Sequence, residues 1–563
     1  MANEVFASTL LVEVEGSPLP ADVAVLLAEG YVEDSVNLLD VFVLRFRDPD
    51  KTVLAKGRFT IGAKVRLSVR TSDPGAPETL VTGEVTAVSI DFDQAGTFTE
   101  VRGYDEAHRL TRGRRTAAYP GMTVGDVVRK VAQRAGLQPG EIDQVPEIGG
   151  REHVQLSQVG QSDWEFLSGL ARRVGARVRV AANRLSFVLL RPPAGAPAGE
   201  ARAERDPLVL EAGSSLLSLR AHVSAMEQPA QVEVRGWDVE QKREIVASAE
   251  PRLAEATISG VDPAGFGSTF SAPPYVVGDS RHRTQADARA LADALAADLG
   301  GGAAEVEGVA RGNPKLRAGT AVALANVGAP FDGKHTLTAT RHVFSPSGYQ
   351  TTFTICGRQD RTLYGLAAGM PAAAQGPVSA VAQGLVPAIV SDVRDPMNLG
   401  RVRLVMPWLS ADFTSGWARV AQPGAGAGRG AVLPHEVGDE VLAGFVHGDV
   451  DHPYVLGGLF NGVDALPSLS APLIDSGGQA GVRALVSRTG HRVELVEDGG
   501  MLIQTGDGRL SVELDQKSGK VMIKGSAGVA VDAGAGSLEL SGARVSISGK
   551  AEVTVKGAQV RIN

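Results

Sequence analysis

The C-terminal part of the chain carries a hydrophobic pattern of regular spacing. Between Leu510 and Ile562, pairs of apolar residues that skip one position alternate with joints containing glycine, serine and aspartate. This alternation predicts very short strands with one buried face, and many such strands at one period are typical of a β-solenoid. The apolar positions are Val512, Leu514, Val521, Ile523, Val529, Val531, Leu538, Leu540, Val545, Ile547, Val553 and Val555, with Val560 and Ile562 at the tip.

One chain is too short to bury this face alone. A single-chain solenoid rung takes roughly 20 residues and about three rungs are needed for stability, which is more than this C-terminal pattern provides. Three chains wound together would share one apolar core and would pair every strand edge except those at the tip. The sequence therefore predicts a homotrimer whose residues 483–563 form an intertwined triple-stranded β-helix, a needle.

The remainder of the chain is predicted to be mainly β with a small helical part. Helices are expected from Thr123, from Ser162 and over 284–299. In the helix that begins at Ser162, Glu165 completes a capping box and Trp164 belongs to the buried stripe. The predicted division is a first hub β-barrel at 1–115, an α/β insert at 116–207, a second hub β-barrel at 208–364, a linker at 365–385, an OB-fold collar at 386–462, a linker at 463–482 and the needle at 483–563.

The composition limits the partners and the compartment. The formal net charge of -8 argues against nucleic acid as the main partner. The single cysteine, Cys356, excludes an internal disulfide and suits synthesis in the cytoplasm. The opening MANEVFASTL has neither a basic start nor an apolar run, so we expect no signal peptide.

Residues 386–462 contain an ordered series of motifs. They are LGRVRLVMPW, SGWARVAQP, PHEVGDEVL, and a GDVDHP turn before YVLGGLFNG. This series resembles the OB-fold collar of the VgrG and phage-tail spike family. The matching positions are Gly400, Arg401, Pro407, Trp408, Trp417, Pro423, Gly438, Asp439, Asp449, Asp451, Pro453, Asn461 and Gly462.

The N-terminal part resembles the phage late-control D hub, through QSDWEFLSGLARRVGA and VEVRGWD. As a whole the chain is most similar to the spike of extracellular contractile injection particles. The resemblance implies that two barrels in each of three chains form a pseudo-sixfold ring, which adapts a hexameric inner tube to the threefold needle. The implied partners are the inner tube protein, baseplate proteins, a PAAR-type tip protein and, transiently, the target envelope. The chain would belong to an assembled particle that is cytoplasmic or released.

One cluster has the residue types of metal ligands, namely His435, His447, Asp449, Asp451 and His452. We favour a strand-end turn, which the spike family fills with acidic residues and proline. The glycine-rich stretch 424–430 lacks the Lys-Ser/Thr of a phosphate loop. The sequence therefore predicts no catalytic, cofactor-binding or metal site, and no enzymatic activity.

The expected function is structural puncturing, and two other classes stay open. A receptor-binding trimeric tailspike or adhesin would also carry a β-helix, although no large receptor domain is visible. An envelope-degrading hydrolase would need paired carboxylates in an aromatic-lined site. Aromatic residues make up only 5% of this chain, which disfavours that class.

Overall fold

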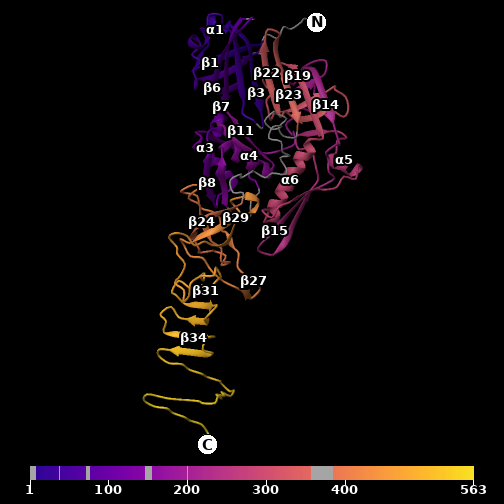
Figure 1. Ribbon diagram of the computed structural model, residues 1–563. Coiled ribbons are helices and arrows are strands. Elements are labelled where there is room, and N and C mark those ends of the chain that lie inside the picture. Colours follow the sequence, from indigo (N-terminus) through magenta and orange to yellow (C-terminus); the bar gives the residue numbers. More distant parts are fainter. Residues whose placement is uncertain are drawn as a thin grey trace, which may run out of the picture. The chain divides into compact units, whose positions relative to one another are not determined.

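A computed structural model describes residues 8–36, 38–71, 76–94, 96–145, 155–198, 201–356 and 384–562. The chain forms two compact units, Met1–Leu459 and Phe460–Asn563. Strands are the main regular structure in both, as predicted (Figure 1). The predicted linker at 365–385 lies outside the described residues except for its last two positions. No described helix is both long and apolar enough to cross a membrane.

An 11-stranded sheet dominates the first unit, and strands of both predicted barrels enter it. The two halves meet where β3 pairs antiparallel with β22, with Ser35 opposite Ala339 and Gly30 opposite Phe344 (Figure 1). The sequence predicted a hub barrel in each half, and the β3–β22 pairing lets one sheet run through both halves. In sheet order the strands are β14 (Leu216–Val223), β19 (Ala304–Arg311), β23 (Gly348–Cys356), β22 (Ala339–Ser345), β3 (Leu27–Ser35), β4 (Val41–Arg47), β7 (Gly96–Asp105), β6 (Glu78–Asp93), β5 (Lys64–Arg70), β1 (Thr9–Val14) and β2 (Ser17–Pro18).

Smaller elements complete the two halves. In the first half they are α1 (Ala21–Ala24), α2 (Val53–Lys56) and the 3-10 helix η1 (Glu106–Thr111). In the second half they are a four-stranded sheet of β13 (Val209–Glu211), β20 (Ala321–Ala325), β21 (Gly333–Thr336) and β17 (Ala256–Ile258), a three-stranded sheet of β16 (Arg243–Ala249), β15 (Val232–Asp238) and β18 (Tyr275–Gly278), and the helices α5 (Pro263–Thr269) and α6 (Gln285–Gly301). Thr284 caps α6 as predicted, but the helix runs on through Gly300 and Gly301.

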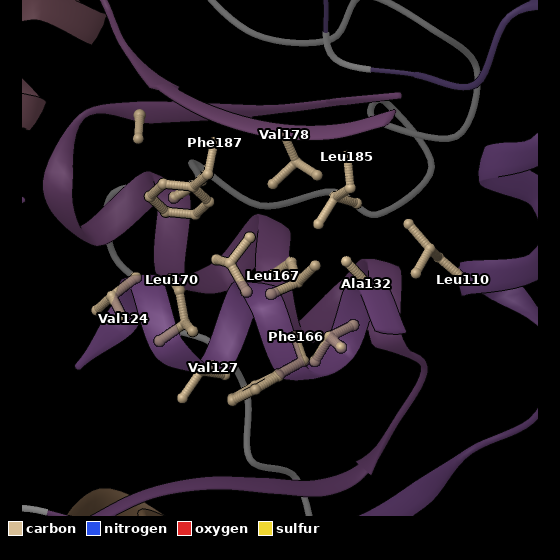
Figure 2. Close-up of a cluster of buried hydrophobic side chains, with 14 of the residues drawn as sticks. Leu110, Val124, Val127, Ala132, Phe166, Leu167, Leu170, Val178, Leu185 and Phe187 are labelled. Carbon is tan, nitrogen blue, oxygen red and sulfur yellow. The ribbon is translucent and has the colours of Figure 1, made fainter. Parts of the chain in front are cut away.

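The region predicted as an α/β insert contains both helices and strands. Its elements are β8 (Arg115–Pro120), α3 (Val124–Arg134), β9 (Gln138–Ile142), β10 (Gln155–Gln161), α4 (Asp163–Val174), β11 (Ala176–Ala181) and β12 (Arg184–Leu189). The capping box of α4 pairs Ser162 with Glu165, and the helix ends at Gly175 in the left-handed region. Figure 2 shows side chains of both helices meeting those of β11 and β12. The α4 stripe contains the buried Phe166, whereas Trp164 is only half-buried, which corrects our prediction.

The OB domain occupies the predicted region. Its five strands, in sheet order, are β25 (Arg403–Val405), β24 (Leu385–Asp392), β29 (Glu440–Phe445), β30 (Pro453–Gly458) and β26 (Arg419–Val420), accompanied by the hairpin of β27 (Ala425–Gly426) and β28 (Arg429–Gly430) and by the 3-10 helix η2 (Val446–Gly448). The OB core takes in Val159 of β10, and Ala118 of β8 packs against it. The insert therefore helps to close the OB core.

The second unit contains a five-stranded antiparallel meander. Its strands are β31 (Val482–Val486), β32 (Arg492–Val496), β33 (Gly500–Gln504), β34 (Leu510–Asp515) and β35 (Lys520–Gly525). No strand is assigned over 526–562, although the pattern predicted several there. A strand needs a hydrogen-bonded neighbour, and the single chain supplies none in this segment.

Candidate functional site

The first candidate is the apolar face, the side of the meander on which large apolar side chains gather. The register puts Leu514 between Met501 and Val521, and it puts Val512 between Ile503 and Ile523. The residues of the apolar face are Leu485, Val493, Leu495, Met501, Ile503, Val512, Leu514, Val521 and Ile523. Their exposed fractions run from 37% for Val512 to 68% for Val521. The sequence correctly placed the last four on one side, but it missed the first five, whose shorter strands alternate in the same way.

The opposite side of the meander is partly covered by its own chain. Val482 and Glu494 are buried there. The Ser470 backbone N–H donates to Glu494 Oε2 at 3.2 Å, and Arg492 Nη1 donates to the Ser468 carbonyl at 2.8 Å. The segment predicted as a linker at 463–482 thus contacts β32. The apolar face is therefore the side that lacks such a cover among the described residues.

The apolar face is also hollowed. A cavity of about 490 Å³ is lined by Leu495, Met501, Leu514 and Val521, with Lys520 and Gln516 among its polar residues. Further along the chain, the remaining predicted core and tip positions are exposed by 51% to 92%. They are Val529, Val531, Leu538, Leu540, Val545, Ile547, Val553, Val555, Val560 and Ile562.

The second candidate is the collar signature, whose residues brace the OB domain. Arg401 donates from Nε and Nη2 to Asp395 Oδ1, at 3.1 and 2.6 Å. Burial alone would raise the pKa of Asp395, but Arg401 and three backbone N–H groups hold it well below its usual range. The Trp417 ring lies under two guanidinium groups, 5.9 Å from Arg401 and 5.0 Å from Arg403.

Other signature positions shape turns. Trp408, next to Pro407, is 48% exposed, and its indole N–H donates to the Pro387 carbonyl at 2.9 Å. Gly400 and Gly438 have φ of 69° and 100°, which favour glycine. Asp439 Oδ2 accepts the Glu436 N–H at 2.8 Å.

The last signature residues divide between the two units. Pro453 opens β30 and is buried, and Pro423 follows β26. Asn461 Oδ1 accepts from the N–H groups of Val463 and Asp464 at the start of the second unit, beside Gly462. The signature is therefore a set of turn and packing positions, consistent with a structural collar.

The acidic turn, Gly448–Pro453, contains most of the metal-type cluster. Asp451 Oδ2 accepts the Ser157 N–H at 3.1 Å, and Asp449 Oδ2 lies 3.5 Å from Arg281 Nη1. His435 has a different neighbour, Asp439, at 3.7 Å. Over the described ranges, no group of three or more His, Cys, Asp or Glu side chains is arranged to hold a metal ion. The carboxylates of the turn have protein partners instead.

Comparison with known proteins agrees with this architecture. Residues 386–460 match the type VI secretion system/phage-baseplate injector OB domain, and residues 6–345 match the Alg8 N-terminal domain. A 74-residue stretch is 36% identical to the type VI secretion system spike protein VgrG3 of Vibrio cholerae, covering 12% of this chain and 7% of that protein.

The fold also resembles that of solved structures. A chain in the half-lidded Francisella PdpA-VgrG complex superposes with a TM-score of 0.51 at 9% identity, over 93% of this chain and 89% of that one. The lidded form of the complex gives a TM-score of 0.50 at 10% identity, over 93% and 81%. Because the N-terminal family model covers more than half of the chain, this protein belongs to the Alg8 N-terminal domain family, and the domain that follows is similar to the OB domain of type VI secretion and phage-baseplate injectors.

Proposed function

We propose that this protein is the homotrimeric hub and spike of a contractile injection system. Its second unit would join two further copies to form a triple-stranded needle, and its first unit would form a ring that adapts a hexameric inner tube to that threefold needle. When the sheath contracts, the protein would transmit the force that drives the needle through the target envelope. Its role would be structural, as in the spike and tail proteins that it resembles.

The apolar face carries this proposal. Burying one large aliphatic side chain contributes roughly 1.5–3 kcal/mol, and all nine residues of the apolar face are at least one-third exposed in the single chain. Soluble monomers rarely expose a contiguous patch of this kind. Two further copies of the same face would cover it and would extend the strand pattern into 526–562, where the single chain forms none.

The edges of the 11-stranded sheet are consistent with the proposed ring, because they offer unpaired strands to neighbouring copies. β14 is one end of the sheet, and among the described strands its ladder partner is β19. On the other side β6 extends beyond its pairing with β5, and its free part exposes Val88, Ile90 and Phe92. Exposed apolar edges of this type bind a further strand. Neighbouring copies in a ring would supply that strand to each other.

The remaining partners follow from the same assembly. The wide end of the ring would contact the inner tube and the baseplate. The exposed tip residues, Val560 and Ile562, would take a PAAR-type cap. Binding to other proteins is a feature of the relatives, since VgrG occurs in the Francisella PdpA-VgrG complex. We propose that the protein acts within an assembled particle, cytoplasmic or released, and contacts the target envelope only during firing.

Sedimentation equilibrium of the full chain at micromolar concentration tests the proposal. We expect a species of three times 58.5 kDa, and electron microscopy of the same sample should show a threefold ring tapering to a rod. A folded monomer at that concentration would contradict the proposal. A trimer that hydrolyses peptidoglycan or polysaccharide, with activity lost on a single substitution, would contradict the structural role alone.

A further inference from the structure

The apolar face of the meander consists of two columns of side chains, one near each side edge of the sheet. The column next to the turns 497–499 and 516–519 consists of Leu495, Met501, Leu514 and Val521. All four line the hollow of about 490 Å³, so the hollow follows this column. We call this side of the meander the hollow edge. A side chain from outside the chain can enter the apolar face here.

The second column lies next to the turns 487–491 and 505–509, on the side that we call the opposite edge. It consists of Leu485, Val493, Ile503, Val512 and Ile523. In its middle, Ile503 is 56% exposed and Val512 is 37% exposed. One chain thus carries a hollow at one edge and exposed aliphatic side chains, of a kind that could fill such a hollow, at the other.

The hollow edge carries an acidic turn. The turn 497–499 contains Glu497 and Asp498 and no basic residue, whereas Lys517 belongs to the other turn of this edge. Glu497 is paired with Arg483 on the neighbouring strand. Asp498 is exposed. It is therefore the carboxylate of this turn that can meet a cation from another chain.

The opposite edge carries an exposed cation. The turn 505–509 ends in Arg509, whose side chain is 74% exposed. Its Nε lies 3.8 Å from Asp507 Oδ2, a long distance between two exposed groups. Such a contact contributes little to stability. Arg509 is therefore available to a second carboxylate, and the two edges are complementary in charge as well as in shape.

In the proposed trimer these two edges would meet. The strands are stacked from β31 to β35, so the turns lie at the two sides of the stack (Figure 1). Three copies whose apolar faces point at one axis would form a triangular prism. Each corner would bring the hollow edge of one copy to the opposite edge of the next, since a closed ring of identical copies joins two different patches.

The order of the turns determines which of them would face each other. The turn 505–509 joins β33 to β34. At the hollow edge, one turn lies a strand earlier, between β32 and β33, and the other lies a strand later, between β34 and β35. At equal height the turn of the neighbouring copy would therefore fit between them. Arg509 would come next to Asp498, and Ile503 and Val512 of the same copy would be level with the hollow.

We propose that each corner of the needle is a socket, in which the hollow of one copy takes up Ile503 and Val512 of the next copy and Asp498 pairs with Arg509 of that copy. This inference rests on the trimer proposed above and names the contact between its copies. Burial of the two aliphatic side chains would supply most of the affinity. The exposed ion pair would mainly fix which turns face each other.

Cysteine cross-linking of the full chain tests the socket. Asp498 and Arg509 lie at opposite edges of the sheet, and the five residues of β33 between those edges span roughly 17 Å. A disulfide needs Cα atoms within about 7 Å, so Asp498→Cys with Arg509→Cys cannot close within one chain. With Cys356→Ser removing the native thiol, we expect a covalent trimer on a denaturing gel without reductant.

The matched control combines Arg509→Cys with Glu513→Cys. Glu513 lies between Val512 and Leu514 in β34 and therefore points to the other side of the sheet. This control should give no covalent trimer. A sample that sediments as a trimer but does not cross-link between positions 498 and 509 would overturn the socket and leave the proposed function standing. A folded monomer would overturn both.

Reversal of the two charges gives a second readout. Asp498→Arg and Arg509→Asp should each weaken the trimer, because like charges would then face each other at all three corners. An exposed pair changes an equilibrium constant by roughly 1.4- to 5-fold, so three corners should raise the trimer dissociation constant by about 3- to 100-fold.

The variant that combines both reversals restores opposite charges at each corner. Its dissociation constant should lie within about threefold of the wild-type value. Sedimentation equilibrium at the urea concentration that dissociates half of the wild-type trimer measures all four proteins. A combined variant that is weaker than both single variants would overturn the pairing of Asp498 with Arg509.

Discussion

The molecule contains two five-stranded sheets in which apolar and polar residues alternate along the strands. The apolar side chains of the two sheets differ in how far their own unit buries them. In the OB sheet, Val390, Leu404 and Val441 are completely buried by their own unit. In the meander, the equivalent positions on the apolar face stay at least one-third exposed. Alternation therefore predicts that one face of a strand is covered, but it does not predict whether the same chain or another chain covers that face. The OB domain is covered by its own chain and by the insert, whereas we propose that the meander is covered by sister copies.

The largest effect is expected from charges placed on the apolar face. In Val521→Asp with Ile523→Asp, three chains would bring six carboxylates into the shared core. Each unpaired buried charge costs several kcal/mol, so we expect the trimer to dissociate in sedimentation equilibrium.

The adjacent side of β35 provides the control for this experiment. Lys524 points away from the apolar face, since it alternates with Ile523, whereas Lys520 borders the hollow in that face and carries no apolar contact in the predicted core. Replacing both with alanine should leave the trimer intact. Equal dissociation by both double variants would show that the wrong face has been assigned.

A substitution that creates a cavity in the OB core should have the next largest effect on stability. Leu404 is fully buried in that core, and Leu404→Ala should destabilise the domain by about 2–5 kcal/mol. Leu433→Ala, at a position 47% exposed, should cost much less. Hydrogen exchange on β24 and β29 measures the loss. Trimer formation should survive in both variants, because the OB sheet is covered within its own chain.

The Arg401–Asp395 pair should have a smaller, pH-dependent effect. Because the folded state lowers the pKa of Asp395, its contribution is present above about pH 4 and is lost as the pH falls further. Arg401→Gln should cost roughly 1.5–3 kcal/mol at pH 7. The fall in OB stability between pH 5 and 3 should be shallower than in the wild type, as measured by exchange on β25. An unchanged acid slope would show that Arg401 does not set this pKa.

The smallest effect is expected at Trp408. The substitution Trp408→Phe removes the hydrogen bond to the Pro387 carbonyl but keeps a ring on a half-exposed surface. The cost should be about 0.5–1.5 kcal/mol, read from exchange on β24. A loss as large as that of Leu404→Ala would mean that Trp408 is covered in the assembly.

Local features of the fold were predictable because they depend on nearby residues. Thr123 and Ser162 cap their helices as expected; the predicted capping box forms at Ser162, and a second one, which was not predicted, forms at Thr123 with Asp126. The buried residues of α4 were harder to predict, since Phe166 and Trp164 are both large and apolar. The helical spacing places Phe166 with Leu170, and this decided which aromatic ring is buried.

The contacts of the candidate site were less predictable because their partners lie far away in the sequence. The sequence indicated a turn at Asp449–His452, but Ser157, which binds Asp451, lies 294 positions earlier. The strands β3 and β22, which pair, also lie far apart in the sequence. On the meander, the alternation revealed the apolar side of β34 and β35, whereas the proposed number of chains that cover it rests only on the length of the pattern.

The β3–β22 ladder has a consequence for how the protein is made. A ribosome that has just completed β3 must still synthesise about 300 residues before β22 emerges, which takes roughly 15–60 s at 5–20 residues per second. During that interval the edge of β3 that later pairs with β22 stays unpaired in the nascent chain. Slow synthesis would therefore lengthen the period in which polysomes making this protein are prone to aggregation, and a chaperone that shields the edge of β3 would raise the yield of complete hubs.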